Sequence, residues 1–238
     1  MESPDFSVVI PVFNEEENIA PLCRELRETL NRWGRAYEVL IVDDGSTDST
    51  LDKLRQAKAV FPSLRVIRNP RRFGQSAALA AGFRFARARV LVTMDGDLQI
   101  DPEDILRLLE TAGEYRAAVG RRQRRRDPAP KHFQAKLANR IRSLVLQDRF
   151  ADIGCPLRVF PRADLERIQL FDGFHRFLPV LLAAAGRTVL QVPVNHRPRR
   201  RGRSKYGGLN RIFRTTADLF GVNWMLRRRI EAAGEEVE

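Results

Sequence analysis

The sequence predicts an α/β fold in which helices cover both faces of a mostly parallel sheet. Three observations support this prediction. Apolar runs rich in β-branched residues alternate with helix-like segments through the first half of the chain. Each apolar run ends in a polar turn, as strands do at the ligand-binding edge of a parallel sheet. The 238 residues, of which 43% are hydrophobic, can also bury one substantial core.

The first two pairs of strand and helix follow one plan. A β-branched run over residues 6–11 predicts a strand that ends at Pro11, and a helix over 15–33 follows, ended by Gly34. Apolar side chains recur in it at helical spacing: Ile19, Leu22, Leu26 and Leu30. A buried strand is expected over 39–42, and polar residues mark the start of the second helix: Ser46, Thr47, Asp48 and Ser49.

The next elements repeat this alternation. Residues 64–70 predict a short third strand, and the small-residue segment 76–88 predicts a helix. The run 90–92 predicts a buried strand, and Pro102 stands near the first turn of the helix that follows. Parallel strands with right-handed crossovers are the expected result.

The second half of the chain is more basic. Residues 131–150 place an apolar stripe among lysines and arginines, which predicts a basic amphipathic helix. A late strand over 188–194 leads into a charged loop that contains glycine. We therefore predict one domain over 1–208, without an internal repeat or linker, and a basic amphipathic tail over 209–238.

Charge and cysteine content narrow the classes of partner and compartment. Against 30 acidic residues the chain carries 42 lysines and arginines, a net charge of +12, which favours anionic partners such as phosphorylated metabolites, nucleic acid or acidic lipid. Cys23 and Cys155 are too isolated for a disulfide framework or a zinc site, so a reducing cytoplasm is expected. The acidic start predicts no signal peptide, and the late apolar stretch 177–186 is too short to span a bilayer.

An acidic turn follows the strand at 90–92. Asp95, Asp97 and Gln99 offer hard oxygen ligands, and two carboxylates on one turn suit Mg²⁺ or Mn²⁺ held partly by substrate phosphates. The alternative is a solvated acidic turn before a helix. The pattern alone does not choose between these interpretations.

Two further turns fall at the same predicted edge. Asp43 follows the second strand and is placed to accept hydrogen bonds from a nucleobase or a ribose. Its neighbours are better explained as turn and helix-cap residues: Asp44, Ser46 and Asp48. After the first strand, Pro11 and Phe13 can form a wall against a base, and Glu15 can reach a polar edge. Glu16 and Glu17 are interpreted as residues that stabilise the helix dipole.

The fourth element is the basic loop "HRPRRRGRSKYGG". Its side chains can neutralise a diphosphate, with forked donors from arginine and a compact charge from lysine. The cations are Arg199, Arg200, Arg201, Arg203 and Lys205. The alternative, a solvated basic loop, is expected for most of the individual arginines, and His196 is interpreted as structural.

These four elements together resemble the motifs of family 2 glycosyltransferases, which have the GT-A fold with its Rossmann-like sheet. The matching segments, in chain order, are "FSVVIPVFNEEENI", "EVLIVDDGSTDST", "VTMDGDLQIDPEDI" and "HRPRRRGRSKYGG". The likeness is to the polyprenyl-phosphate sugar synthases in particular, such as dolichol-phosphate mannosyltransferase, and it runs from about Phe6 to Gly208. It implies that the domain over 1–208 is catalytic.

The resemblance assigns roles to individual residues. It implies that the donor nucleotide is contacted by Pro11, Phe13, Glu15, Ile41 and Asp43. It implies a turn for metal and diphosphate made of Asp95, Gly96, Asp97 and Gln99. The basic residues that match those holding the donor diphosphate or the acceptor phosphate are Arg122, Arg199 and Lys205. Asp152 matches a position that orders the acceptor lobe.

The implied reaction moves a sugar from GDP-mannose or a UDP-sugar to dolichyl, undecaprenyl or another polyprenyl phosphate, with inversion of the anomeric carbon. Asp95, Asp97, Arg122, Arg199 and Lys205 are the residues expected to carry catalysis, with a divalent cation, Mg²⁺ or Mn²⁺, at the leaving diphosphate. The acceptor phosphate has a second pKa of about 6 and is already anionic, so no general base is required.

A lipid acceptor requires contact with a membrane. The helix predicted over 131–150 has the composition of an interfacial helix, and so does the tail. The bulky residues of the tail are Phe213, Phe220, Trp224 and Met225. We therefore expect a cytoplasmic protein held peripherally on the cytoplasmic face of a membrane. The alternative is that these stripes pack on the protein's own core, on a second copy or on a membrane-protein partner.

Three rival functions are weaker. A family 2 transferase acting on a glycan or protein hydroxyl would need a general base near the acceptor. A nucleic-acid-binding protein would fit the charge, but the basic runs lack interleaved aromatic residues, and Asp95 and Asp97 would be unexplained. A nucleotidyltransferase would carry a glycine-rich phosphate loop after the first strand, and "PVFNEEE" has none.

Overall fold

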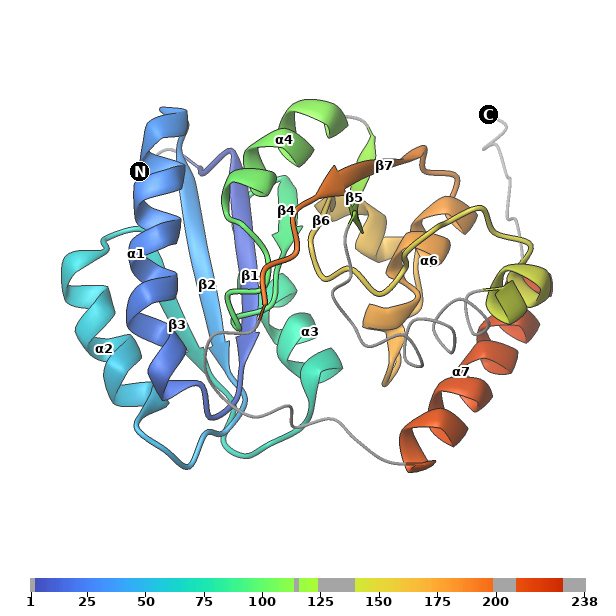
Figure 1. Ribbon diagram of the computed structural model, residues 1–238, viewed down its shortest axis with the longest axis horizontal. Helices are drawn as coiled ribbons and strands as arrows, with labels where there is room; N and C mark the ends of the chain where they lie inside the picture. The colour runs from blue at the N-terminus through green and yellow to red at the C-terminus, as the bar shows by residue number, and fades with distance from the viewer. Residues whose placement is uncertain (1–2, 114–115, 124–139, 199–208, 229–238) are drawn as a thin grey trace, which may run out of the picture.

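The computed structural model describes residues 3–113, 116–123, 140–198 and 209–228, with side chains from 214 onward in the last segment (Figure 1). Seven strands form one sheet in the order β3-β2-β1-β4-β6-β5-β7. Their bounds are β1 Phe6–Val12, β2 Tyr37–Asp43, β3 Leu64–Arg68, β4 Val90–Thr93, β5 Ala117–Arg122, β6 Arg158–Pro161 and β7 Val189–Val194. Only β6 runs antiparallel to its neighbours, so the predicted mostly parallel sheet is confirmed.

Helices cover both faces of this sheet, as predicted. One core lies under α1 (Glu16–Trp33), α2 (Thr50–Val60) and α4 (Glu103–Ala112). The other core lies under α3 (Gln75–Phe85), α6 (Leu178–Ala184) and α7 (Leu209–Arg227). The four apolar residues that predict the first helix all face the first core: Ile19, Leu22, Leu26 and Leu30. Neighbouring residues of a strand point to opposite faces, so Val8 packs in the first core and Val9 in the second.

The predicted basic helix over 131–150 is partly wrong. Residues 124–139 lie outside the described part, and the described helix covers 140–146 and stops before Gln147, whose φ is +53°. Arg142, one of the basic residues of the predicted helix, is buried and pairs with the Asp148 carboxylate at 3.1 Å. Ile141 and Leu144 are exposed instead.

Two sequence expectations concern cysteines and membrane spans. Cys23 and Cys155 are free thiols, and burial raises their pKa values to about 12 and about 11. Within the described residues, no helix combines the length and the apolar character needed to cross a bilayer.

A buried carboxylate joins the first three strands to the chain before β4. Glu38 accepts hydrogen bonds from Ser7 Oγ, from the Arg87 backbone N–H and from Arg65 Nη1, each at 2.6 Å. Burial by itself raises the pKa of Glu38, but these hydrogen bonds outweigh it and lower the pKa. The stabilising contribution is therefore present above the pKa of the unfolded chain and is lost as pH falls through the folded pKa.

Replacement of this carboxylate tests that account. We expect Glu38→Gln to lower the free energy of unfolding by about 1–3 kcal/mol at pH 7, because charge-assisted hydrogen bonds are lost in a buried site. Urea unfolding measures this, and the difference from wild type should shrink as the pH is lowered through the folded pKa of Glu38. The exposed Glu110→Gln is the control and should change little. A Glu38→Gln chain as stable as wild type would contradict the account.

Candidate active site

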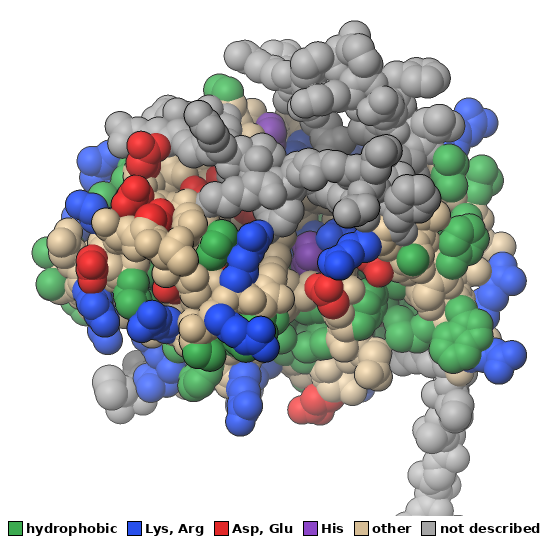
Figure 2. Space-filling view, turned by 90° about the horizontal axis from the view of Figure 1, so that it is seen from below, with side chains coloured by type: hydrophobic (Ala, Val, Ile, Leu, Met, Phe, Trp, Pro, Cys, Tyr) green, Lys and Arg blue, Asp and Glu red, His purple; other side chains and the backbone are tan. Residues whose placement is uncertain are grey.

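Three polar turns meet at one edge of the sheet. β1, β2 and β4 run parallel, with Val12 beside Asp43 and Val9 beside Thr93, so their carboxyl ends lie together. The turns that follow carry residues 13–15, 44–49 and 94–99. The strands point downward in Figure 1, and Figure 2 looks onto this edge, where charged side chains and histidine gather near the middle of the face. The prediction that these turns share one edge is confirmed.

The turns after β1 and β2 are tied together by Asn14. Its backbone N–H donates to Ser46 Oγ at 2.9 Å, and its Oδ1 accepts from the Thr47 N–H at 2.8 Å. Phe13 lies beside them with the Arg72 guanidinium 4.3 Å from its ring centroid, a cation–π arrangement. Glu15 accepts a 2.6 Å hydrogen bond from Asn18 Nδ2. The sequence patterns missed Arg72, because no motif marks an arginine that reaches this wall from the loop before α3.

The two aspartates after β2 differ in their partners. Asp44 closes the loop before α3: it accepts hydrogen bonds from Asn69 Nδ2 and from the backbone N–H groups of Phe73 and Gly74, at 2.7–3.0 Å. Its predicted structural role is confirmed. Asp43 is fully buried, and Oδ1 accepts from the Ser46 N–H at 3.1 Å. Asp43 Oδ2 is buried without a hydrogen-bond partner among the described residues.

Ile41, which the resemblance places in contact with the donor nucleotide, is fully buried in the first core, between Ile10 and Val66 in the sheet. It lies within β2, two residues before Asp43, and its contact with the donor stays a prediction. Pro11, in the neighbouring strand, is half-buried.

The acidic turn after β4 is held from several sides. Gln75 Nε2 donates to Asp95 Oδ1 at 2.9 Å, and the Gln99 N–H donates to Asp97 Oδ1 at 3.2 Å. Leu98 between them adopts φ +60°, a backbone conformation that costs energy for a residue with a side chain. A Cβ on Gly96 would lie 2.7 Å from Val12, so only glycine fits there without a shift. The turn therefore has a constrained shape that presents Asp95 and Asp97.

The segment after β7 is fastened to this turn. The Arg197 N–H donates to the Gln99 carbonyl at 2.7 Å, and its guanidinium pairs with Asp101 at 2.7 Å and with Glu25 at 2.6 Å. His196 forms a β-bridge with Ile100. Arg199 and Lys205 lie outside the described residues, so the structure places neither. The described residues that precede them, His196 and Arg197, contact the acidic turn.

A cavity of about 230 Å³ lies directly beside Asp95. Three arginines and a histidine line it: Arg122, Arg158, Arg176 and His175. Arg122, at the end of β5, makes a forked pair with Asp152 through Nε and Nη2 at 2.7 and 2.8 Å. Burial lowers the pKa of Arg122, but the hydrogen bonds and charge of Asp152 outweigh it and raise the pKa. Asp152, expected to order the acceptor lobe, thus orients Arg122.

Arg158 is the most deeply buried cation of this cavity. It is 4% exposed, and burial lowers the pKa of its guanidinium. Nη2 donates to the Ile153 carbonyl at 3.1 Å, but Nε has no hydrogen-bond partner among the described residues. No carboxylate in the described part forms an ion pair with it. The charges of Asp95 and Asp152 act on this guanidinium without a direct ion pair, and a buried cation of this kind at a cavity wall favours an anionic ligand.

His175 and Arg176 extend the wall toward α7. His175 Nδ1 lies 2.8 Å from Ser76 Oγ, which also accepts from the Gly173 N–H at 2.8 Å. Arg176 pairs at 2.9 Å with Asp218 of α7. Sequence patterns did not single out Arg158, His175 and Arg176, because these residues reach the site only through the tertiary fold.

The metal ligands predicted from sequence fit an ion shared with a substrate. Described residues contain no group of three or more His, Cys, Asp or Glu side chains arranged to hold a metal ion. Asp95 and Asp97 supply two carboxylates on one turn, and Mg²⁺ and Mn²⁺ accept such a pair when phosphate oxygens complete their coordination. The donor set therefore suits a hard divalent cation that arrives with a diphosphate.

Comparison with protein families and curated sequences gives a consistent result. The family model described as "Glycosyl transferase family 2" matches residues 7–169. The chain is 34% identical to dodecaprenyl-phosphate galacturonate synthase of Rhizobium johnstonii, over 95% of this chain and 69% of that protein. It is also 34% identical to undecaprenyl-phosphate 4-deoxy-4-formamido-L-arabinose transferase of Edwardsiella ictaluri, over 84% of this chain but only 62% of the relative's length.

Solved structures share the fold. Glucosyl-3-phosphoglycerate synthase of Mycobacterium tuberculosis, in complex with Mn²⁺ and UDP-glucose, superposes with a TM-score of 0.70 at 18% identity, over 97% of this chain and 81% of that one. A mannosyltransferase of Pyrobaculum calidifontis, in complex with GDP-mannose and Mn²⁺, gives 0.58 at 20% identity, over 95% and 73%. The predicted GT-A fold is confirmed.

Proposed function

Because this chain belongs to glycosyl transferase family 2, we propose that it moves a sugar from a nucleotide-sugar donor to the phosphate of a polyprenyl lipid, with inversion at the anomeric carbon. One observation carries the proposal: the acidic turn with Asp95 and Asp97 lies directly beside a cavity lined by arginines. A negatively charged acceptor would meet the donor diphosphate there. The names of the two curated relatives, both of which act on polyprenyl phosphates, support the same acceptor class.

The donor lies across the turns after β1 and β2. Asp43 Oδ2, buried without a partner in the described part of the chain, accepts hydrogen bonds from the base or the ribose. Phe13 and Pro11 form the wall against the base, with Arg72 on the Phe13 ring, and Glu15 reaches a polar edge. The base is guanine or uracil in this proposal, so the donor is GDP-mannose or a UDP-sugar.

The leaving diphosphate lies at the acidic turn. Asp95, Asp97 and Gln99 would hold a divalent cation, Mg²⁺ or Mn²⁺, which would act as a Lewis acid on the departing diphosphate. Gly96 lets the turn pack closely against Val12, and Gln75 holds the Asp95 carboxylate in place. Arg199 and Lys205 contribute positive charge from the segment that begins at this turn. These residues stabilise charge where it develops as the glycosidic bond breaks.

The acceptor phosphate occupies the arginine-lined cavity. A phosphate oxygen attacks the anomeric carbon while the bond to the diphosphate oxygen breaks and its electron pair leaves with the nucleoside diphosphate. Arg122, oriented by Asp152, and Arg158 bring the two anions together. No general base takes part, because the phosphate is already ionised near neutral pH.

Labelled donors test the function. The chain is incubated with labelled GDP-mannose, UDP-glucose and other nucleotide sugars, with Mn²⁺ or Mg²⁺, and with undecaprenyl phosphate. We expect one donor to transfer label to the lipid. The matched acceptor is undecaprenol, which has a hydroxyl in place of the phosphate and should accept none. Transfer to undecaprenol or to a glycan hydroxyl would favour the alternative acceptor class, and no transfer from any donor would overturn the proposal.

The lipid acceptor implies a membrane-facing side. Figure 1 draws the helix at 140–146 close to α7, and both helices pack on the second core. On their outer sides, Leu144 is 73% exposed and Trp224 is 62% exposed. Arg228 lies over the Trp224 ring, 5.6 Å from its centroid. We propose that this surface holds the protein peripherally on the cytoplasmic face of a membrane.

Vesicle flotation measures this contact. We expect wild type to float with anionic vesicles. The Leu144→Ser/Trp224→Ser variant should remain largely in the soluble fraction, because it loses the apolar side chains that would insert into the membrane. Val60→Ser/Phe85→Ser removes two other exposed apolar side chains and serves as the control. If both variants float like wild type, the surface serves a second copy or a protein partner instead.

A further inference from the structure

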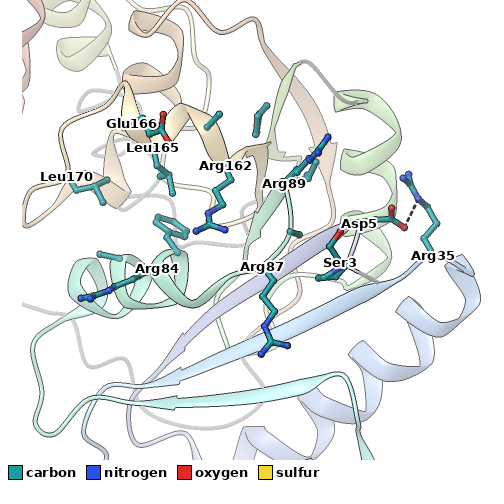
Figure 3. A pocket seen from close by; sticks show the side chains of 17 residues that line it. Ser3, Asp5, Arg35, Arg84, Arg87, Arg89, Arg162, Leu165, Glu166 and Leu170 are labelled. Carbon is teal, nitrogen blue, oxygen red and sulfur yellow. Dashed lines mark ion pairs between the residues drawn. The ribbon is translucent and has the colours of Figure 1, made fainter. Parts of the chain in front are cut away.

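A second, larger hollow lies at the opposite edge of the sheet from the candidate active site. Its volume is about 1040 Å³, and it is bordered by the end of α3, the start of β4 and the 3-10 helix η1 (Arg162–Glu166), as Figure 3 shows. We call it the arginine hollow after the cations that line it: Arg35, Arg84, Arg87, Arg89 and Arg162. β1 and β4 begin here and end at the polar turns, so none of the proposed catalytic residues borders it.

The arginine hollow has an excess of positive charge. Only two acidic residues line it, and one of them, Asp5, already pairs with Arg35 at 3.4 Å. Within the described residues, no ion pair joins the other four arginines to a carboxylate. Like charges gathered around one hollow repel each other, and an anion between them removes that repulsion. Arginine forks match phosphate oxygens in particular.

The backbone that carries these arginines is fixed. The Arg87 N–H donates to Glu38 Oε1 at 2.6 Å, and the Ala88 N–H donates to Ser7 Oγ at 3.1 Å. The Arg162 N–H donates to the Arg89 carbonyl at 2.7 Å. A ligand would therefore have to order side chains only, which keeps the entropic cost of binding low.

The walls between the arginines are apolar. Phe83, Leu165 and Leu170 line the hollow together with alanines, proline and valine. In Figure 3 the Arg162 side chain reaches toward the middle, while Arg84 and Arg87 stand at the rim. A volume of this size is that of a cleft for a nucleotide-sized molecule.

We propose that the arginine hollow is a second anion-binding site, which takes a molecule with a phosphate group next to an apolar or aromatic part. Arg89 and Arg162 bind the phosphate, and the wall around Phe83 and Leu165 takes the apolar part. Two sources offer this chemistry: a free nucleotide and the headgroup region of an anionic phospholipid. The site is separate from the donor site and does not depend on the proposed transfer reaction.

Calorimetry with GDP and with inorganic pyrophosphate, both in metal-free buffer, tests a soluble source. The full chain is compared with Arg89→Ala/Arg162→Ala, whose two side chains are exposed, and with the control Arg24→Ala/Arg149→Ala, which removes two exposed arginines elsewhere. We expect the hollow variant to bind pyrophosphate about tenfold more weakly and to lose one of the two GDP sites of wild type, since the donor site remains, and the control to bind like wild type. Sugar transfer should be unchanged in both.

Flotation with phosphatidylglycerol vesicles tests the lipid source with the same variants. Weaker flotation of Arg89→Ala/Arg162→Ala than of the control, with unchanged binding of GDP and pyrophosphate, assigns the site to a lipid headgroup; the surface with Leu144 and Trp224 accounts for the flotation that remains. Arg84→Ala/Arg87→Ala is a second pair from the same rim and should show the same reduction. If both pairs keep the melting temperature of wild type and bind all three probes as wild type does, the hollow is a solvated surface and the proposal is overturned.

Discussion

Asp97→Ala is expected to lower kcat/KM for sugar transfer by about a thousandfold, the scale seen when one preorganised group at a developing charge is removed. Asp97 is one of two carboxylates on a turn whose shape is constrained at Gly96 and Leu98. Its loss would weaken both cation binding and the seating of the diphosphate. The same change should abolish the metal-dependent rise in melting temperature that the correct nucleotide sugar gives to wild type.

Controls separate this effect from a loss of folding. Asp97→Ala without ligand should melt close to wild type, because its side chain is only half-buried. Asp52→Ala removes an exposed carboxylate whose surface ion pair with Arg55 contributes little, and it should keep full activity. If Asp97→Ala retained more than half of the wild-type activity, the acidic turn would be the solvated turn that the sequence pattern also allows, and the metal proposal would fail.

The first half of the fold was predictable because each helix and strand has a clear pattern in its own local sequence. The leucines of α1 repeat at helical spacing and all lie in one core, and the β-branched runs of β1 and β2 are buried as expected. β6 was not predicted: its four residues carry no periodicity of their own, and it inserts antiparallel between β4 and β5. Strand pairing between segments that lie far apart in the sequence depends on tertiary contacts, which a local sequence pattern does not contain.

The candidate site likewise contains some residues that the sequence pattern marked and others that it did not. The position of Asp43 at the end of β2 and of Asp95 and Asp97 in the turn after β4 was predictable, because the strand pattern places all three at the carboxyl edge of the sheet. Arg158 and His175 were not singled out, because only the tertiary fold brings them beside Asp95. Ile41, two residues before Asp43, packs in the core.

Arg158 therefore offers the sharpest test of the acceptor cavity. We expect Arg158→Met to keep stability close to that of wild type, because removing a buried cation that has no direct ion pair saves a desolvation cost that offsets the lost attraction to Asp95 and Asp152. The same variant should lose about a hundredfold in kcat/KM for undecaprenyl phosphate, since a charge-assisted contact to the acceptor is missing. The rise in melting temperature that the donor gives should persist, because Arg158 is not one of the residues proposed to contact the donor base.

Arg142→Met is the matched control, since Arg142 is also a buried arginine with unpartnered nitrogens in the described structure, but it faces Asp148 at 3.1 Å. Its removal leaves the buried Asp148 carboxylate without its cation, so we expect a loss of about 3–5 kcal/mol in the free energy of unfolding. At a temperature where it stays folded, its KM for the acceptor should match wild type. Urea unfolding and acceptor kinetics on both variants distinguish the two arginines. If Arg158→Met were destabilised and kept its acceptor kinetics, Arg158 would be a structural residue and the phosphate would have to bind elsewhere.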